Sequence, residues 1–383
     1  MTGRLPDRAI GAVGFLSFWD RFGLPPMMVV LAQQTGLSLA QVAQLFAVFT
    51  LMYAVGQPLW GLLSDRFGRV PVLRVALGLA LVGSVATVLS AEHSWLLATR
   101  GLTGLAVGCL YPTMLTTIGD SRTGTERVRA LSFLQSWSAL GNTVATLLTG
   151  TLTVLVSWRL PFLLTAAGAL TLLWVLRPVA TVPPNPGGMV LSDAFRPWPL
   201  VVYLMAMLEG TVMLGALSYI VPAMQERGLG VSLAGLLAAT YGAGVIGGAF
   251  VVRQVADRVT RTRTIVVGGV FLCAAFLLAA TWGSVLALSL TAVLIGLANA
   301  VIHVSLQGWA TEVAPRARAT SVSFFAGSLF LGSSLAVFAT ADLADAGRFG
   351  LVFALALAVS VLLTVSAAAL HEIWQRGQPR TTP

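Results

Sequence analysis

Two carboxylates lie deep inside long apolar runs of this chain. Asp20 is ten residues into the run 10–31, and Glu209 is ten residues into the run 199–222. At a rise of about 1.5 Å per residue, both lie about 15 Å along a helix, near the middle of a bilayer. Carboxylates at that depth are usually paired or protonated, and they often mark ion or proton pathways. Asp20 and Glu209 are therefore candidate proton-coupling groups, with a structural ion pair as the alternative for each.

Two arginines also lie inside apolar runs. Arg21 follows Asp20, and because neighbouring residues on a helix point in different directions, we expect Arg21 to face a substrate anion or another carboxylate. Arg100 is five residues from the outer end of its run, so it either snorkels to the interface or serves the proton site. Pro25 and Pro26 are predicted to break the helical hydrogen bonding just outward of Asp20 and to expose backbone carbonyls that are useful at a binding site.

Three uncharged polar residues complete the candidates within the apolar runs, namely Asn142, Asn299 and His303. Each can contact a ligand or form a hydrogen bond between helices. His303 can exchange a proton near neutral pH, and we expect it toward the cytoplasmic end of its run. The sequence has no nucleotide-binding loop, metal-ligand cluster or Ser/His/Asp set in a usable context. We therefore expect that the protein is not an enzyme and has no cofactor or metal site. The energy for its activity is expected to come from an ion or substrate gradient.

The composition indicates which elements carry these residues. The 383 residues are 57% hydrophobic and only 10% charged, whereas an average soluble domain is about a quarter charged. The chain is therefore an all-α membrane protein with several membrane-spanning helices. Apolar runs separated by charged, Pro or Gly residues predict twelve spans, approximately at 10–31, 40–63, 70–90, 95–118, 130–156, 160–176, 199–222, 231–252, 264–282, 285–310, 319–341 and 349–370.

A proline-rich segment divides the twelve spans into two groups of six. Residues 177–198 contain five prolines and a Gly-Gly pair, a composition that disfavours a regular helix. We interpret this segment as a cytoplasmic linker. It separates an N-terminal six-helix bundle at 1–176 from a C-terminal six-helix bundle at 199–383.

The arginines predict the orientation in the membrane. All 23 basic residues are arginine. Arg21 and Arg100 fall within spans, and Arg159, Arg227 and Arg348 fall in loops on one side of the membrane. The other eighteen lie on the opposite side, in short loops and at the termini. Because cytoplasmic loops are enriched in basic residues, both termini are predicted to lie in the cytoplasm. The predicted location of the protein is the plasma membrane.

The two halves share internal repeats. A D-R-x-x-R pattern follows the second span of each half at an offset of 192 residues, formed by Asp65, Arg66 and Arg69 and by Asp257, Arg258 and Arg261. An R-x-R pattern opens the fifth span of each half at an offset of 189 residues, from Arg127 to Arg316. Secondary transporters are commonly built from such repeats, with a site near the midplane between them.

These motifs resemble those of the major facilitator superfamily over essentially the whole chain. Residues 61–69 match the signature G-x-L-x-D-R-x-G-R, and Leu96, Arg100 and Gly104 match the pattern L-x-x-x-R-x-x-x-G. Residues 56–60 resemble the twelve-span drug:proton antiporter branch. That branch normally has a Gly-Pro pair in its fifth span, where this chain has Gly141 and Asn142.

The signature loop also has a physical interpretation. Gly61 allows two helices to approach closely, and Asp65 is suited to the N-terminus of a helix. Gly68 permits a tight turn, and Arg69 can pair with a carboxylate or a lipid phosphate. The resemblance implies that this loop, with Arg66 and its counterpart in the second half, acts as a conformational latch on the cytoplasmic side.

Together these observations predict the major facilitator fold and a proton-coupled secondary active transporter that works by alternating access. The expected substrates are small amphipathic or drug-like molecules that are exported by antiport. The alternative is uptake or exchange of a metabolite anion, with Arg21 and Arg100 as its clamps. A membrane sensor or assembly factor of the same fold is a further alternative. Membrane lipids are expected as partners, and nucleic acid is not. We expect the protein to be a monomer.

Overall fold

The structure, a computed structural model, describes residues 5–177, 179, 191–255 and 259–378, with the backbone alone at 191, 251–255 and 319. Within these ranges the chain forms helices, turns and loops, and no strand occurs. This result confirms the predicted all-α fold. A helix satisfies its own backbone hydrogen bonds, which is the condition for a single segment to cross a bilayer.

The first six predicted spans form seven helices in the described part of the chain, because the fourth span is interrupted near Gly108. Its two pieces together form one candidate membrane span, His93–Ser121. The helices are α1 (Asp7–Thr35), α2 (Leu39–Phe67), α3 (Arg69–Thr87), α4 (His93–Val107), α5 (Leu110–Ser121), α6 (Gly124–Leu155) and α7 (Arg159–Leu176).

Helix α1 differs in composition from the other spans. Eleven helical segments among the described residues are long and apolar enough to cross a membrane, and α1 is not one of them. It is 29 residues long, but Asp20, Arg21 and two prolines lower its hydropathy. Helix α1 continues through Pro25 and Pro26, although neither residue has an amide hydrogen to donate to the preceding turn. Helix α6 packs along α1 and supports it.

The second group of spans contains more irregular helix than the first. Most of the predicted linker lies outside the described residues; its described part includes one helical turn, and the seventh span begins at Pro197. The elements are α8 (Leu191–Ala194), α9 (Pro197–Gly210), the π-helix η1 (Thr211–Gly215), the 3₁₀-helix η2 (Ala216–Tyr219), α10 (Ile220–Glu226), α11 (Val231–Ala238), α12 (Thr240–Val255), α13 (Arg261–Thr281), α14 (Val285–Ala298), the π-helix η3 (Asn299–His303), α15 (Val304–Val313), α16 (Arg318–Asp345) and α17 (Phe349–Arg376).

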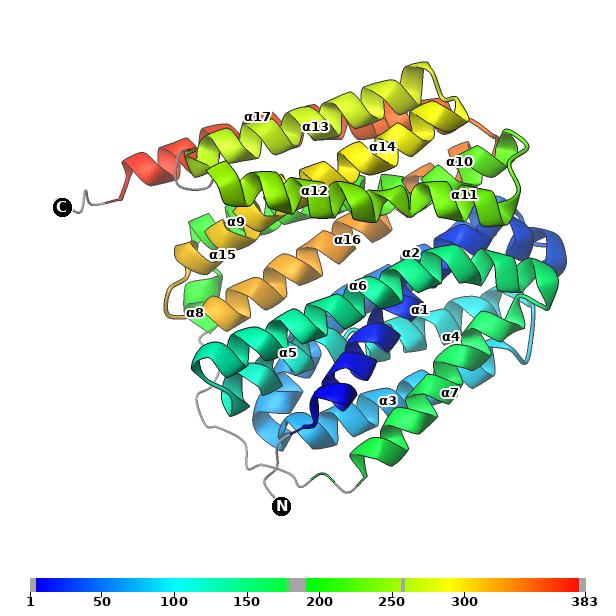
Figure 1. Cartoon of the computed structure of the whole chain (residues 1–383), viewed down its shortest axis with the longest axis horizontal. Helices are drawn as coiled ribbons and strands as arrows, with labels where there is room; N and C mark the ends of the chain where they lie inside the picture. The colour runs from blue at the N-terminus through cyan, green and yellow to red at the C-terminus, as the bar shows by residue number, and fades with distance from the viewer. Residues whose placement is uncertain (1–4, 178, 180–190, 256–258, 379–383) are drawn as a thin grey trace. The chain divides into compact units, whose positions relative to one another are not determined.

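The same helix pairs pack together in each repeat. In the first, α2 packs on α4 and α3 packs on α7; in the second, α12 packs on α14 and α13 on α17 (Figure 1). By contacts, the chain divides into one compact unit of Met1–Met189, Val221–Leu236 and Val337–Gly347, and another of Val190–Ile220, Leu237–Ala336 and Arg348–Pro383. The repeated pairing agrees with the pseudo-symmetric six-helix bundles predicted from the repeated motifs.

Candidate functional site

Asp20 of α1 and Arg100 of α4 form a buried ion pair in the first repeat. Nη1 and Nη2 of Arg100 each donate a hydrogen bond to one Asp20 carboxylate oxygen at 3.3 Å, and Thr165 Oγ1 of α7 donates a third at 3.1 Å. The Arg100 and Asp20 side chains are only 1% and 2% exposed. Both oxygens of the carboxylate are therefore hydrogen-bonded, in the bidentate geometry that suits a guanidinium.

Aromatic rings and a close helix crossing fix the position of Arg100. Its guanidinium carbon lies 4.6 Å from the centre of the Phe49 ring and 5.0 Å from that of Phe162. One turn further along α4, Gly104 allows close packing on α2, because a Cβ there would collide with the carbonyl oxygen of Phe49. Arg100 therefore does not snorkel to the interface; it lies in a closed aromatic environment with its counter-ion.

Glu209 of α9 and His303 of η3 form a second pair, in the second repeat. Oε1 of Glu209 lies 3.0 Å from Nδ1 of His303. The Glu209 side chain is fully buried, whereas that of His303 is 24% exposed. Oε2 of Glu209 is buried and has no hydrogen-bond partner among the described residues. The contact places His303 level with Glu209, and His303 lies in the second half of its span, Val285–Val313.

Both helices that carry the second pair depart from regular α-helix at this point. The π-helix η1 begins two residues after Glu209, and the π-helix η3 ends at His303. Nδ2 of Asn299, the first residue of η3, lies 3.9 Å from Sδ of Met213 in η1. Single π-helical turns occur frequently at functional sites because they redirect the side chains that follow.

The two pairs occupy equivalent helices of the two repeats. Glu209 follows Asp20 by 189 residues, the same offset that separates the two R-x-R motifs. In each repeat the acidic residue is on the first span and the basic residue on the fourth. The sequence identifies all four residues as candidates but not which of them are partners.

Arg21 lies among aromatic side chains. Its guanidinium carbon is 4.1 Å from the ring centre of Phe18, 4.5 Å from that of Phe22 and 5.9 Å from that of Tyr53. The Tyr111 ring lies against Phe18, with 5.2 Å between the ring centres. We call these four rings with Arg21 the aromatic cluster. Sequence reasoning did not find it, since its members come from three separate helices.

Asn142 does not join either pair in the described part of the structure. It is partly exposed on α6, and its carbonyl oxygen accepts a hydrogen bond from Thr146 Oγ1. Its neighbour Gly141 allows α6 to approach α1, because a Cβ there would lie 2.5 Å from the carbonyl oxygen of Phe15. Gly141 thus has a packing role at the crossing of α1 and α6.

The signature loop folds around Arg69. Gly68 has φ = 89°, which confirms the prediction that this turn requires glycine. Nη1 of Arg69 lies 2.6 Å from Oδ1 of Asp65, and its Nε lies 3.1 Å from Oδ2 of Asp120, at the end of α5. Arg66 is exposed, and Gly61 is partly exposed on α2. The sequence predicts a carboxylate partner for Arg69, but the second one, Asp120, was missed.

An equivalent ion pair occurs in the second repeat. Nη2 of Arg261 donates to Oε1 of Glu312 at 2.8 Å. Glu312 follows Asp120 by 192 residues, the offset that relates the two D-R-x-x-R motifs, so the repeat itself held the signal for both acidic partners. Asp257 and Arg258, the other members of the second motif, lie outside the described residues.

The chemistry available in these sites is proton exchange and the rearrangement of ion pairs. Within the part of the chain that the structure describes, no three His, Cys, Asp or Glu side chains come together as a possible metal site. The Glu209–His303 pair contains two groups that exchange protons in water, whereas a guanidinium stays charged.

The family model described as Major Facilitator Superfamily matches residues 10–253 and 200–382 of the chain. Among curated proteins, the quinolone resistance protein NorB of Staphylococcus aureus (strain JH9) is 30% identical over 131 residues. That match covers 34% of this chain and 28% of NorB, so the chain spans less than a third of the curated relatives' length.

Solved transporter structures match nearly the whole chain. The nucleoside transporter NupG has a TM-score of 0.77 at 12% identity, covering 97% of this chain and 99% of NupG. The POT family transporter PepTSo has a TM-score of 0.76 at 13% identity, covering 98% and 99%. A bacterial homolog of the human lysosomal transporter Spinster has a TM-score of 0.70 at 20% identity, covering 97% and 96%. At these identities the likeness is one of fold.

Proposed function

Because this chain belongs to the major facilitator superfamily and is a membrane transporter, we propose that it is a proton-coupled carrier that exports small amphipathic or drug-like molecules by alternating access. One observation supports the proton assignment above the others. The buried Glu209 has one carboxylate oxygen beside His303 and the other without a hydrogen-bond partner among the described residues.

The two protonation states of the Glu209–His303 pair differ in how well the buried charge is compensated. With a proton bound, either a carboxylate faces an imidazolium or a neutral acid faces a neutral imidazole. Without it, a carboxylate keeps one hydrogen bond from a neutral imidazole, while its second oxygen is buried and has no partner among the described residues. An incompletely compensated buried charge is unfavourable. The deprotonated form therefore favours a conformation in which Glu209 meets water, which links proton release to the change of access.

Asp20 has the opposite environment, and we assign it a different role. Its oxygens accept two hydrogen bonds from Arg100 and one from Thr165, so the charged form is already compensated. Protonating Asp20 would leave the buried Arg100 without its counter-ion. Of the two carboxylates predicted for proton coupling, Glu209 is therefore the better candidate, and Asp20 ties the first span to the fourth.

The aromatic cluster supports a substrate that is both aromatic and charged. Aromatic faces stack on flat ring systems, and the Arg21 guanidinium attracts a carboxylate or another anion. The 30% identity to a quinolone resistance protein over 131 residues supports the drug-like class. Substrates that contain an aromatic ring system and an acidic group are thus the first to test.

Carriage of a metabolite anion is the second candidate function. In this alternative, Arg21 and Arg100 would both bind the anion. Arg100 is buried and engaged by Asp20, so only Arg21 supports this alternative. A carrier of this kind would transport small organic anions that lack aromatic rings, which separates it from the first proposal.

Transport by the purified protein in liposomes with an imposed pH gradient tests the proposal. We would follow a fluorescent quinolone and a lipophilic cation in the wild type, in Glu209→Gln and in Glu226→Gln. Glu226 is an exposed glutamate on the same span, so it serves as the matched control. We expect a protonophore to stop wild-type transport and Glu209→Gln to reduce gradient-driven transport about tenfold or more. Gradient-driven transport that survives in Glu209→Gln would refute the assignment.

We also propose that the protein lies in the plasma membrane as a monomer with both termini in the cytoplasm. The bias of eighteen arginines toward one side supports this orientation. The variants Glu92→Cys and Thr123→Cys test this orientation. Glu92 is exposed in a loop on the predicted outer side, and Thr123 is exposed in a loop on the predicted inner side. A membrane-impermeant thiol reagent should label the first in intact cells and the second only after lysis; the reverse pattern would invert the topology.

A further inference from the structure

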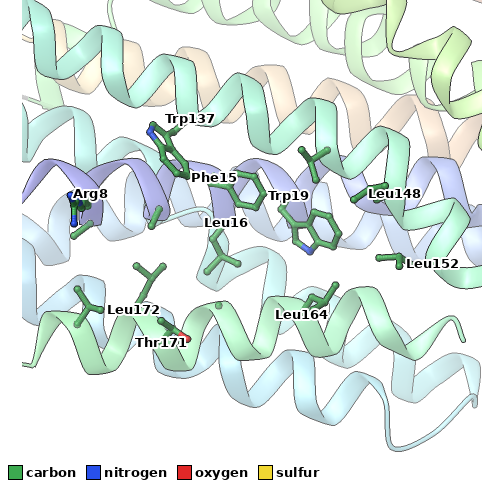
Figure 2. A pocket seen from close by; sticks show the side chains of 15 residues that line it. Arg8, Phe15, Leu16, Trp19, Trp137, Leu148, Leu152, Leu164, Thr171 and Leu172 are labelled. Carbon is green, nitrogen blue, oxygen red and sulfur yellow. The ribbon is translucent and has the colours of Figure 1, made fainter. Parts of the chain in front are cut away.

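An apolar groove runs between α6 and α7 of the first repeat, with α1 as its floor (Figure 2). Its volume is about 650 Å³. Trp137, Leu148 and Leu152 of α6 line one side, and Leu164 and Leu172 of α7 line the other. We call it the lateral groove. It is separate from the Asp20–Arg100 pair, because none of its lining residues belongs to that pair.

Small residues create the hollow. Ala9 and Ala12 of α1 and Gly168 of α7 line it, where larger side chains would fill the space. A Cβ on Gly168 would lie 2.9 Å from the Leu16 side chain, so α1 and α7 already touch beneath the groove. The floor of the groove is therefore packed where Gly168 meets Leu16.

The walls of the lateral groove face outward at membrane depth. Trp137, Leu148 and Leu164 are 37%, 44% and 42% exposed, although all three are large apolar side chains. They lie on the candidate membrane spans Gly124–Leu155 and Arg159–Leu176. The medium that reaches such a surface is the hydrocarbon of the bilayer.

One end of the groove carries a positive charge. Arg8, in the first turn of α1, lines this end and is exposed (Figure 2). It has no hydrogen bond or ion pair to another of the residues that the structure describes. Its neighbour Asp7 is paired with Arg122, which limits the competition from that carboxylate. The N-terminal turn of a helix also attracts anions.

The groove has the dimensions of one leaflet. Its lining on α1 extends from Arg8 to Trp19, which are eleven helical steps apart, or about 16 Å along a helix. A bilayer's hydrocarbon is about 30 Å thick, so one leaflet is about 15 Å deep. Apart from Arg8 and Thr171 the lining side chains are apolar; the Trp19 indole N–H has its own partner, the carbonyl oxygen of Pro161, at 3.4 Å.

We propose that the lateral groove is a binding site for an anionic phospholipid of the leaflet on the side of Arg8. One acyl chain lies in the apolar channel, and Arg8 holds the phosphate. The length of the groove, its apolar lining and the Arg8 cation at its end together fit a lipid. A transported aromatic compound would need polar recognition that the channel does not offer.

Native mass spectrometry of the full chain in mild detergent tests this site with dioleoyl phosphatidylglycerol and dioleoyl phosphatidylcholine as probes. We expect the wild type to bind one phosphatidylglycerol molecule in preference to phosphatidylcholine. Arg8→Gln should weaken phosphatidylglycerol binding about five-fold and abolish the preference. Arg263→Gln is the matched control, because Arg263 is an exposed arginine in the first turn of α13 that does not line the groove. An equal loss in both variants would indicate general charge attraction and overturn the proposal.

Filling the channel tests the acyl chain. Ala12→Phe narrows the floor, and Leu164→Trp narrows the exposed wall, where folding is less at risk. Either variant, if it elutes as a folded monomer, should lose the bound lipid while Arg8 is intact. Phosphatidylglycerol brominated on its acyl chain should quench wild-type tryptophan fluorescence, and less so in Trp137→Phe. Unchanged binding in both filling variants, or displacement of the lipid by a transported compound, would refute the proposal.

Discussion

Each repeat contains a carboxylate at membrane depth, and the two repeats compensate its charge in different ways. In the first repeat, Asp20 is held by a guanidinium and a threonine, and every carboxylate oxygen has a partner. In the second, Glu209 has one contact to an imidazole and one buried oxygen with no partner among the described residues. The helices differ as well, since both members of the second pair adjoin π-helical turns.

The difference indicates a division of labour within a pseudo-symmetric fold. A guanidinium keeps its charge, so the Asp20–Arg100 pair has one stable state and serves to hold helices together. An imidazole can gain and lose a proton, so the Glu209–His303 pair has two states of different energy. Equivalent positions in the repeats thus provide a fixed contact in one half and a switchable contact in the other.

Breaking the first pair should have the largest effect. Arg100→Gln leaves Asp20 charged and buried without a counter-ion, so we expect a loss of about 3–5 kcal/mol of stability. The measurement is the apparent Tm of the purified protein in detergent. The double variant Asp20→Asn/Arg100→Gln should recover much of the loss, because it removes both charges. A double variant no more stable than the single one would argue against a pairwise electrostatic role.

The glycine crossings beside each pair should have the next largest effect. A Cβ on Gly104 would collide with the carbonyl oxygen of Phe49, and one on Gly210 with that of Leu329. Gly104→Ala and Gly210→Ala should each reduce stability by about 1–3 kcal/mol in the same thermal assay. Gly247→Ala is the control, because its Cβ would meet only Leu297 Cδ2 at 3.9 Å. If all three variants behave alike, close packing does not position the pairs.

Glu209→Gln should affect stability little and function strongly. The substitution removes an incompletely compensated charge but keeps a hydrogen-bond acceptor for His303. We expect a change in stability of no more than about 1 kcal/mol, much smaller than for Arg100→Gln. Thermal unfolding measured beside gradient-driven transport separates the two readouts. A loss of several kcal/mol would mean that Glu209 is structural, like Asp20.

Substitutions in the loop ion pairs of the two repeats should have the smallest effect on stability. Arg69 contacts Asp65 and Asp120, and Arg261 contacts Glu312, the counterpart of Asp120 in the second repeat. All of these groups are partly exposed, so each substitution to Gln should cost about 1 kcal/mol or less. Arg69→Gln and Arg261→Gln should therefore have similar small effects on the apparent Tm, and added salt should reduce both. A loss of several kcal/mol in either variant would show that more than a surface ion pair holds that loop.

Much of the site could be predicted because polar and charged side chains are costly inside a membrane and are therefore rare there. Asp20, Glu209, Arg100 and His303 stand out as polar groups in apolar runs, where each needs a reason. The turn at Gly68 follows from the signature motif, and its φ of 89° agrees. Thr165 had no such signal, because a single threonine in an apolar span is common and needs no distant partner.

The sequence by itself determined the class of protein, the positions of the spans, the repeat and the family. These features depend on hydropathy and on motifs along the chain, which are local properties. Only the tertiary structure decided the partners: Arg100 meets Asp20 across 80 residues, and His303 meets Glu209 across 94. Which side chains meet depends on the rotation of each helix about its axis and on packing against its neighbours. Glycine crossings and π-helical turns set that rotation here, and neither is readable from hydropathy.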